Sequence, residues 1–158
     1  MKKIQTDVEY AVPGLMRIFA AMVYDSLLLA AISIAYGALV VSLRVLIMGQ
    51  PEVGQRIHWD MFSSILITLG WLSVLMFFYI YFWHKFGQTL GMKTWRLQLV
   101  DAQTNQLPSY QQSIKRSFSA LFSLGLCGFG YWYRFTNPQQ RLMHDLFSGT
   151  KLILLKKK

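Results

Sequence analysis

The feature that most constrains this chain is an apolar stretch from Leu15 to Ile47 that contains one aspartate, Asp25. A helix of this length can cross a bilayer, for which about 20 apolar residues suffice. An ionised aspartate near the centre of a membrane helix costs about 2.5–3.5 kcal/mol, while each Leu, Ile, Val or Phe returns only about 0.3–0.6 kcal/mol. We therefore expect Asp25 to have a partner. Arg17 lies about 12 Å away along a helix, so a close partner must come from another segment.

Composition places the chain among membrane proteins of one domain. Of its 158 residues 54% are hydrophobic, and the charged residues gather at the ends of the apolar runs. The net charge of +9 would suggest nucleic acid in a soluble protein. The sequence contains no recognisable nucleic-acid-binding module. We therefore expect the lysines and arginines to face the anionic headgroups of a lipid bilayer. The single cysteine, Cys127, excludes an internal disulfide.

Three apolar runs organise the chain. A polar arm, residues 1–13, precedes the first run and is expected to lie at the membrane interface. A loop, residues 48–60, leads to the second run, Met61 to Trp83, which is uncharged and ends in an aromatic belt. The third run, residues 117–135, is interrupted by glycines. A basic tail, residues 156–158, ends the sequence.

The distribution of Lys and Arg predicts the topology. Of the 16 Lys and Arg residues, only Arg44, at the far end of the first run, and Arg56, in the loop that follows, would lie on the side reached by that run if the third run does not cross. If the third run spanned the membrane, these residues would divide evenly between the two sides and no orientation would be preferred. If it enters and returns, nearly all face one side, as the positive-inside rule requires. We therefore predict two transmembrane helices, a re-entrant third segment, and cytoplasmic N- and C-termini.

Between and after these runs the pattern predicts a small folded element on the inner face. Residues 94–102 alternate with a period of two and predict a strand, and Thr150 to Leu155 predict another, with which it could pair. Ser109 and Gln112 form a capping box that opens a helix. A short polar helix is expected from Gln139 to Phe147, ended by Gly149.

Three features resemble a known family when taken together. They are Arg17 with Asp25, the segment from Gly87 to Lys93 followed by Leu-Val-Asp, and the segment from Arg141 to Thr150 with its His-Asp pair. In order and spacing they resemble the RDD family of bacterial multi-pass membrane proteins, named for one arginine and two aspartates. The resemblance covers residues 14–155, the expected membrane domain. It implies an all-α integral membrane protein of the bacterial inner membrane.

The resemblance also suggests site residues. Arg17 takes the place of the family arginine, Asp25 that of the first aspartate and Asp145 that of the second, with Asp101 as the alternative for the second. His144, beside Asp145, offers a titratable partner near neutral pH. Because some family members look like cation/proton antiporters, the resemblance implies transport of protons or monovalent cations.

A structural role for the same charges is the alternative. In that interpretation Asp25 and Asp145 hold the fold, and Arg17 pairs with an aspartate or extends to the interface. Gly87 and Gly91 lie outside the apolar runs and predict a turn or close packing, as does Gly149. The histidines show no zinc spacing, and no nucleophile elbow appears, so we expect neither a cofactor nor an enzyme.

Two functions of different classes therefore remain. The first is a small transporter that exchanges protons or monovalent cations on intramembrane carboxylates. We expect it to be a homo-oligomer, because two spans enclose little pathway. The second is a non-catalytic membrane scaffold or assembly factor in which Arg17, Asp25 and Asp145 are structural.

Overall fold

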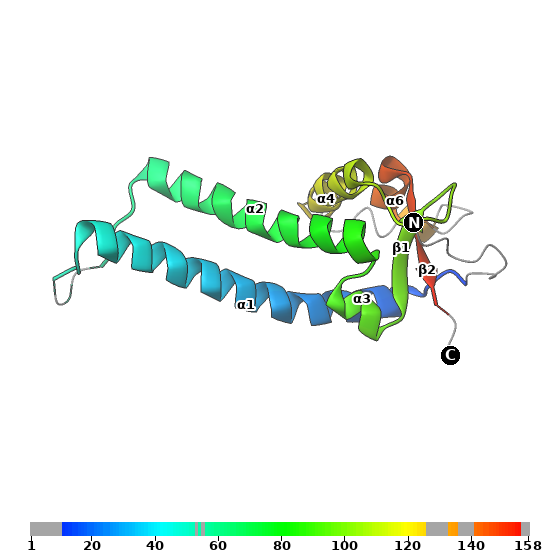
Figure 1. The fold of residues 1–158 in the computed structure, drawn as a ribbon, viewed down its shortest axis with the longest axis horizontal. Coiled ribbons are helices and arrows are strands. Elements are labelled where there is room, and N and C mark those ends of the chain that lie inside the picture. The colour runs from blue at the N-terminus through cyan, green and yellow to red at the C-terminus, as the bar shows by residue number, and fades with distance from the viewer. Residues whose placement is uncertain (1–10, 53, 55, 126–132, 136–140, 156–158) are drawn as a thin grey trace. The chain divides into compact units, whose positions relative to one another are not determined.

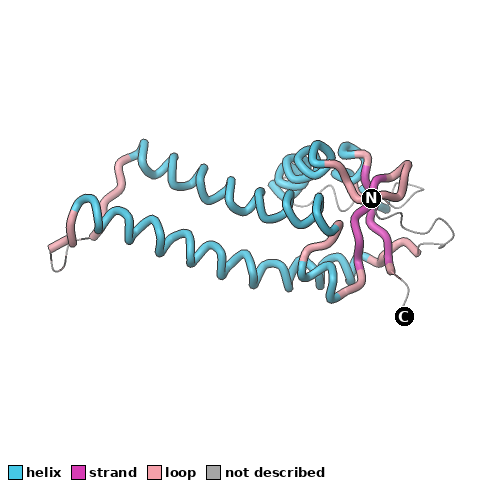
Figure 2. The backbone as a smooth tube through the Cα atoms, viewed as in Figure 1, coloured by secondary structure: helices cyan, strands magenta, loops and turns pink. Residues whose placement is uncertain are grey.

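The computed structural model describes residues 11–52, 54, 56–125, 133–135 and 141–155 (Figure 1). They fall into two compact units. We call residues 26–77 the hairpin unit, and the described part of residues 1–25 and 78–158 the head unit. Two long helices, α1 (Leu15–Met48) and α2 (Met61–Phe86), contribute to both units. Helices dominate and only two short strands are present in the described chain, as the tube in Figure 2 shows.

The hairpin unit is formed by two antiparallel helical segments that are held by polar side chains. The hydroxyl of Tyr36 donates to the carbonyl of Ile67 at 2.8 Å, and the indole Nε1 of Trp71 donates to Ser33 Oγ at 2.8 Å. Asp60 caps the start of α2 by accepting from the backbone and hydroxyl of Ser63. The bonds of Tyr36 and Trp71 satisfy polar groups that lie among apolar helix residues.

Both long helices meet the requirements for membrane spans in length and composition. Almost none of the residues in their most apolar stretches are buried within the protein. Exposed apolar side chains on helices of this length fit a lipid environment, in which they need no protein cover. The expected two spanning helices are therefore present, and α2 continues to Phe86, three residues beyond the predicted end at Trp83.

The head unit contains the expected pair of strands. Strand β1 (Leu97–Asp101) runs antiparallel to β2 (Thr150–Leu154), with Leu99 opposite Leu152. The backbone of Ala11 extends this sheet through an isolated bridge to Leu154. The predicted pairing is thus confirmed, and it brings the start of the described chain to the edge of the same sheet.

The first strand begins later than its alternating pattern predicted. A short helix, α3 (Leu90–Thr94), takes the first of these positions, and Arg96 has a φ of 57° before the strand starts. The cause is local, because Thr89 caps the helix by accepting from the backbone N–H of Met92 at 3.2 Å. The alternation of residues 94–96 therefore belongs to a helix end and a turn.

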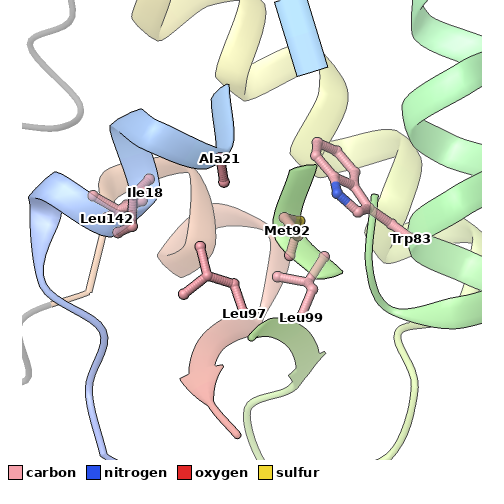
Figure 3. Close-up of a cluster of buried hydrophobic side chains, with 7 residues drawn as sticks. All are labelled: Ile18, Ala21, Trp83, Met92, Leu97, Leu99 and Leu142. Carbon is pink, nitrogen blue, oxygen red and sulfur yellow. The ribbon is translucent and has the colours of Figure 1, made fainter. Parts of the chain in front are cut away.

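The core of the head unit combines the beginnings and ends of several elements (Figure 3). Its buried apolar side chains come from the start of α1, the end of α2, α3, β1 and the residue before α6: Ile18, Ala21, Trp83, Met92, Leu97, Leu99 and Leu142. Burial of a side chain of this size contributes about 1.5–3 kcal/mol. The first turns of α1 are therefore part of a folded head, whereas the rest of that helix belongs to the hairpin unit.

Helix α4 (Tyr110–Gly125) starts with the predicted capping box. The backbone N–H of Gln112 donates to Ser109 Oγ at 3.2 Å, and the backbone N–H of Ser109 donates to Gln112 Oε1 at 2.8 Å. Residues 126–132, which contain the expected re-entrant tip, lie outside the described part of the chain. A single 3-10 turn, η1 (Tyr133–Phe135), follows them. Re-entry of this segment stays a prediction.

Helix α6 (Met143–Ser148) begins later than expected. Residues 139 and 140 lie outside the described chain, and Leu142 has extended backbone angles, so the described helix starts at Met143 instead of Gln139. The predicted end at Gly149 is confirmed, since this residue has a φ of 66° and its N–H caps the last turn. Helix α6 packs beside α4, as Figure 1 shows.

Candidate functional site: two buried aspartates in the head unit

Asp25 is held by two donors from one distant turn. Its side chain is buried, with 3% of its surface exposed. Thr89 Oγ1 donates to one carboxylate oxygen at 2.6 Å, and the backbone N–H of Gly91 donates to the other at 2.9 Å. The prediction that another segment must supply the partner of Asp25 is confirmed, and that partner is a pair of neutral donors.

The hydroxyl of Thr89 acts both as a hydrogen-bond donor and as an acceptor. Its proton goes to Asp25, while a lone pair accepts the N–H of Met92 and caps α3. The start of α3 is thereby tied to α1 at one point. In the sequence Thr89 stands out only as part of the motif between Gly87 and Gly91, and its place two residues before a glycine is the one signal of its role.

A glycine is required at position 91 because α3 and α1 approach each other closely there. A Cβ atom at this position would collide with the backbone carbonyl of Ala21 and would lie 2.9 Å from Asp25 Oδ1. Any side chain would therefore move α3 away from α1 and lengthen the bond from the Gly91 N–H. The expected close packing at Gly91 is what the structure has.

Gly87 makes the turn that precedes this motif. It has a φ of 66°, which favours glycine, and an added Cβ would lie 2.7 Å from the carbonyl oxygen of Leu99. The N–H of Leu99 donates to the Gly87 carbonyl at 2.7 Å. This turn therefore joins the end of α2 to the middle of β1.

Asp145 forms a buried ion pair with Arg116. Arg116 Nε donates to Asp145 Oδ1 at 2.9 Å, and the side chains are 6% and 2% exposed. The guanidinium carbon also lies 4.2 Å from the ring centroid of Trp83, close enough for a cation–π contact. One arginine of α4 thus contacts both α6 and the end of α2.

His144 contributes no positive charge to this pair at neutral pH. Its Nε2 lies 3.8 Å from Asp145 Oδ1. Burial lowers the pKa of His144 and the nearby Arg116 lowers it further, and against the opposing effect of Asp145 it reaches about 4. The imidazole is therefore neutral near pH 7, and the charge balance at Asp145 depends on Arg116.

Arg17 is not the charge partner that the sequence suggested. It is half-buried near the start of α1, and among the described residues it forms no ion pair with Asp25 or Asp145. The aspartates are already occupied by Thr89 with Gly91 and by Arg116. Arg116 was not predicted as a partner of Asp145. Its position between Ser113 and Ser117 on one helix face is the sequence signal of a polar, buried side.

Asp101 belongs to a separate turn. Burial raises the pKa of its carboxyl group, but this effect is outweighed by hydrogen bonds from the backbone of Thr104, the side chain of Gln112 and the backbone of Gln103, which hold the pKa at about 2. The amide of Gln112 also contacts the carbonyl of Gly149 at 3.4 Å. Asp101 therefore joins the β1 turn to α4 and shares no described partner with Asp25 or Asp145.

Each aspartate of the site is thus satisfied from within the head unit. Among the described residues, no group of three or more His, Cys, Asp or Glu side chains is arranged to hold a metal ion. The arrangement holds two buried carboxyl groups in a folded interior and connects α1 to α3 and α4 to α6.

Comparison with known proteins agrees with this arrangement of helices and motifs. The model of the RDD family matches residues 12–149. The chain belongs to the RDD family. Together with the two long apolar helices, this membership makes it an RDD-family membrane protein.

One relative of this RDD protein is an uncharacterized protein of Rickettsia prowazekii (strain Madrid E). The two are 33% identical over 91 residues, which are 57% of this chain and 50% of the relative. The match therefore spans about half the length of that relative. No solved structure matches the chain.

Proposed function

We propose that this RDD protein is a non-catalytic membrane scaffold or assembly factor, in which the buried charges stabilise the head unit. The observation that carries the proposal is the bonding of Asp25. Both of its oxygens accept from donors on one rigid turn, at 2.6 and 2.9 Å. Hydrogen bonds to a charged group contribute about 1.5–3 kcal/mol each.

The second aspartate supports the same role. Protonation of Asp145 would leave the guanidinium of Arg116 buried without an anion, and removing one member of a buried pair costs about 3–5 kcal/mol. A carrier carboxylate has to exchange its ligand in each cycle. The buried contact of Asp145 with Arg116 instead favours a structural residue that holds α4 to α6.

Transport is the second candidate function. It is favoured by one observation, the buried carboxylate of Asp25 immediately before a stretch of α1 that is long enough to span a bilayer. In this mechanism Asp25 and Asp145 exchange protons or monovalent cations, and His144 assists as a titratable neighbour. Arg17 has no described contact with either aspartate, so it would act from a distance.

For either function we propose the same setting. The chain would lie in a bacterial inner membrane with both termini in the cytoplasm, because only Arg44, near the end of α1, and Arg56, in the loop before α2, would place a Lys or Arg on the opposite side. The lysine and arginine side chains on the cytoplasmic side would contact anionic lipid headgroups. Two spans expose much apolar helix surface, so a homo-oligomer is the expected assembly.

Proton flux in proteoliposomes separates the two functions. Wild type and Asp25→Asn are reconstituted at matched incorporation, and flux is driven by gradients of sodium, lithium or potassium. Asp60→Asn is the matched control, since it also removes one carboxylate, but from an exposed helix cap. A scaffold gives no flux in any sample, and the Asp25→Asn protein unfolds at lower temperature while it retains its co-purifying partner per molecule.

The transport function predicts a different result in the same experiment. Cation-driven proton flux in wild type and in Asp60→Asn, lost in a normally folded Asp25→Asn protein, would refute the scaffold proposal. It would make Asp25 an exchanging carboxylate.

A further inference from the structure

Helix α4 has its polarity reversed relative to a helix on the surface of a soluble protein. The face turned to the interior of the head unit is polar, with Ser113, Arg116 and Ser117 buried. The outer face is apolar in the second half of the helix, where Phe118 and Phe122 are 53% and 74% exposed, whereas Gln111 and Lys115 are exposed nearer its start. A helix on the surface of a soluble protein buries its apolar face and exposes its polar face. This reversal indicates that the outer face of α4 meets an apolar medium.

Helix α6 extends the same apolar surface. Phe147 is 68% exposed, and together with Phe118 and Phe122 it lines a groove of about 560 Å³. The described residues that line this groove belong to α4 and α6: Ile114, Lys115, Phe118, Ser119, Phe122, Ser123, Met143, His144 and Phe147. Its volume lies in the range of small-ligand sites, about 300–1,000 Å³.

Among the described residues that line the groove, one is an exposed cation. Lys115 lies on its lining and is exposed, whereas His144 in the same lining is neutral at pH 7, because burial lowers its pKa to about 4. An apolar groove with a single ammonium group at its wall is complementary to a molecule that has an apolar chain and an anionic head. A free phosphate would leave the phenylalanines exposed, and an uncharged alkyl chain would leave Lys115 without an anion.

We propose that the groove between α4 and α6 binds an anionic phospholipid, with an acyl chain against Phe118, Phe122 and Phe147 and the phosphate at Lys115. The surrounding bilayer supplies this ligand, since α1 and α2 leave the head unit as apolar helices long enough to span a membrane. This site is separate from the buried contacts of Asp25. It would anchor the head unit at the lipid headgroups and place α4 at the membrane surface.

The first experiment tests contact with acyl chains. In the full chain with Cys127→Ser, one cysteine replaces Phe122 and, in a control protein, Gln103, which is an exposed polar loop residue. An environment-sensitive fluorophore is attached to each, and the proteins are reconstituted with lipids brominated in their acyl chains. We expect strong quenching at position 122 and little at position 103.

The second experiment tests the headgroup. Native mass spectrometry of the full chain in detergent, titrated with phosphatidylglycerol or phosphatidylcholine, is compared for wild type, Lys115→Gln and Lys93→Gln. Lys93 is a matched control, because it is an exposed lysine of the head unit outside the groove. We expect Lys115→Gln to lose at least threefold in bound phosphatidylglycerol, with no change in phosphatidylcholine, while Lys93→Gln behaves as wild type.

Two results would overturn the proposal. Equal quenching at positions 122 and 103 would show that the apolar face is covered by something other than lipid, and a disulfide between two copies through position 122 would identify that cover as a second chain. Equal phosphatidylglycerol binding by wild type and Lys115→Gln would remove the headgroup site. Lys115 is exposed, so both lysine variants are expected to fold, and matched thermal unfolding curves check this.

Discussion

The buried ion pair between Arg116 and Asp145 allows a quantitative test of the head unit. Replacing Asp145 by Asn removes the negative charge and leaves the guanidinium of Arg116 in an interior where it is 6% exposed. Breaking a buried pair from one side costs about 3–5 kcal/mol. The contact of Arg116 with the Trp83 ring, worth about 0.5–2 kcal/mol, supplies no anion to replace Asp145.

This cost is large compared with the stability of a domain, about 5–15 kcal/mol. For a unit of this size each 1 kcal/mol shifts the Tm by about 4–8 °C, so Asp145→Asn should lower the Tm by at least about 12 °C. Arg116→Met should have a similar effect. The double variant Arg116→Met with Asp145→Leu should recover most of the loss, because apolar residues of similar volume often replace a buried pair without cost.

The assay is thermal unfolding of the full chain in detergent, followed by near-ultraviolet circular dichroism of the tryptophans. Arg17→Met is the matched control, since Arg17 is a half-buried arginine of the same unit with no described ion pair, and its Tm should change by a few degrees at most. The reasoning would be refuted by a loss below about 4 °C for Asp145→Asn. It would also fail if the double variant lost the sum of the two single losses.

Two further predictions concern the neighbours of these aspartates. Gly91→Ala should destabilise the head unit by at least about 2 kcal/mol, because the added Cβ would displace α3 from Ala21 and weaken the hydrogen bond to Asp25. The control is Gly14→Ala, where an added Cβ has open space, and it should change stability by less than about 0.5 kcal/mol. Equal effects of the two substitutions in denaturant titrations would contradict this prediction. For His144 the folded pKa of about 4 lies below its ordinary value of 6.5, so the unfolded chain binds its proton first as pH falls. His144 should therefore leave stability unaffected above pH 6.5 and should lower it as the pH falls from there to about 4. A denaturation series from pH 8 to 4 should show a shallower decline in stability for His144→Gln than for wild type. Parallel curves would refute the lowered pKa of His144.

Much of the local structure could be predicted, because its signals lie within a few residues. The capping box of Ser109 and Gln112, the end of α6 at Gly149 and the apolar lengths of α1 and α2 are all encoded in adjacent turns of chain. The failures were also local. The alternation after Thr94 imitated a strand, because a helix end followed by a turn can show the same period over three residues.

By itself the sequence determined that this is a membrane chain with two apolar helices, and that a carboxylate placed at Asp25 must have a partner. Desolvation makes that requirement, and it is independent of where the partner comes from. Only the tertiary structure decided the partners: Thr89 and Gly91 are 64 and 66 residues from Asp25, and Arg116 is 29 residues from Asp145. No periodicity or cap extends over such separations, so these contacts exist only once α3 packs against α1 and α4 packs against α6.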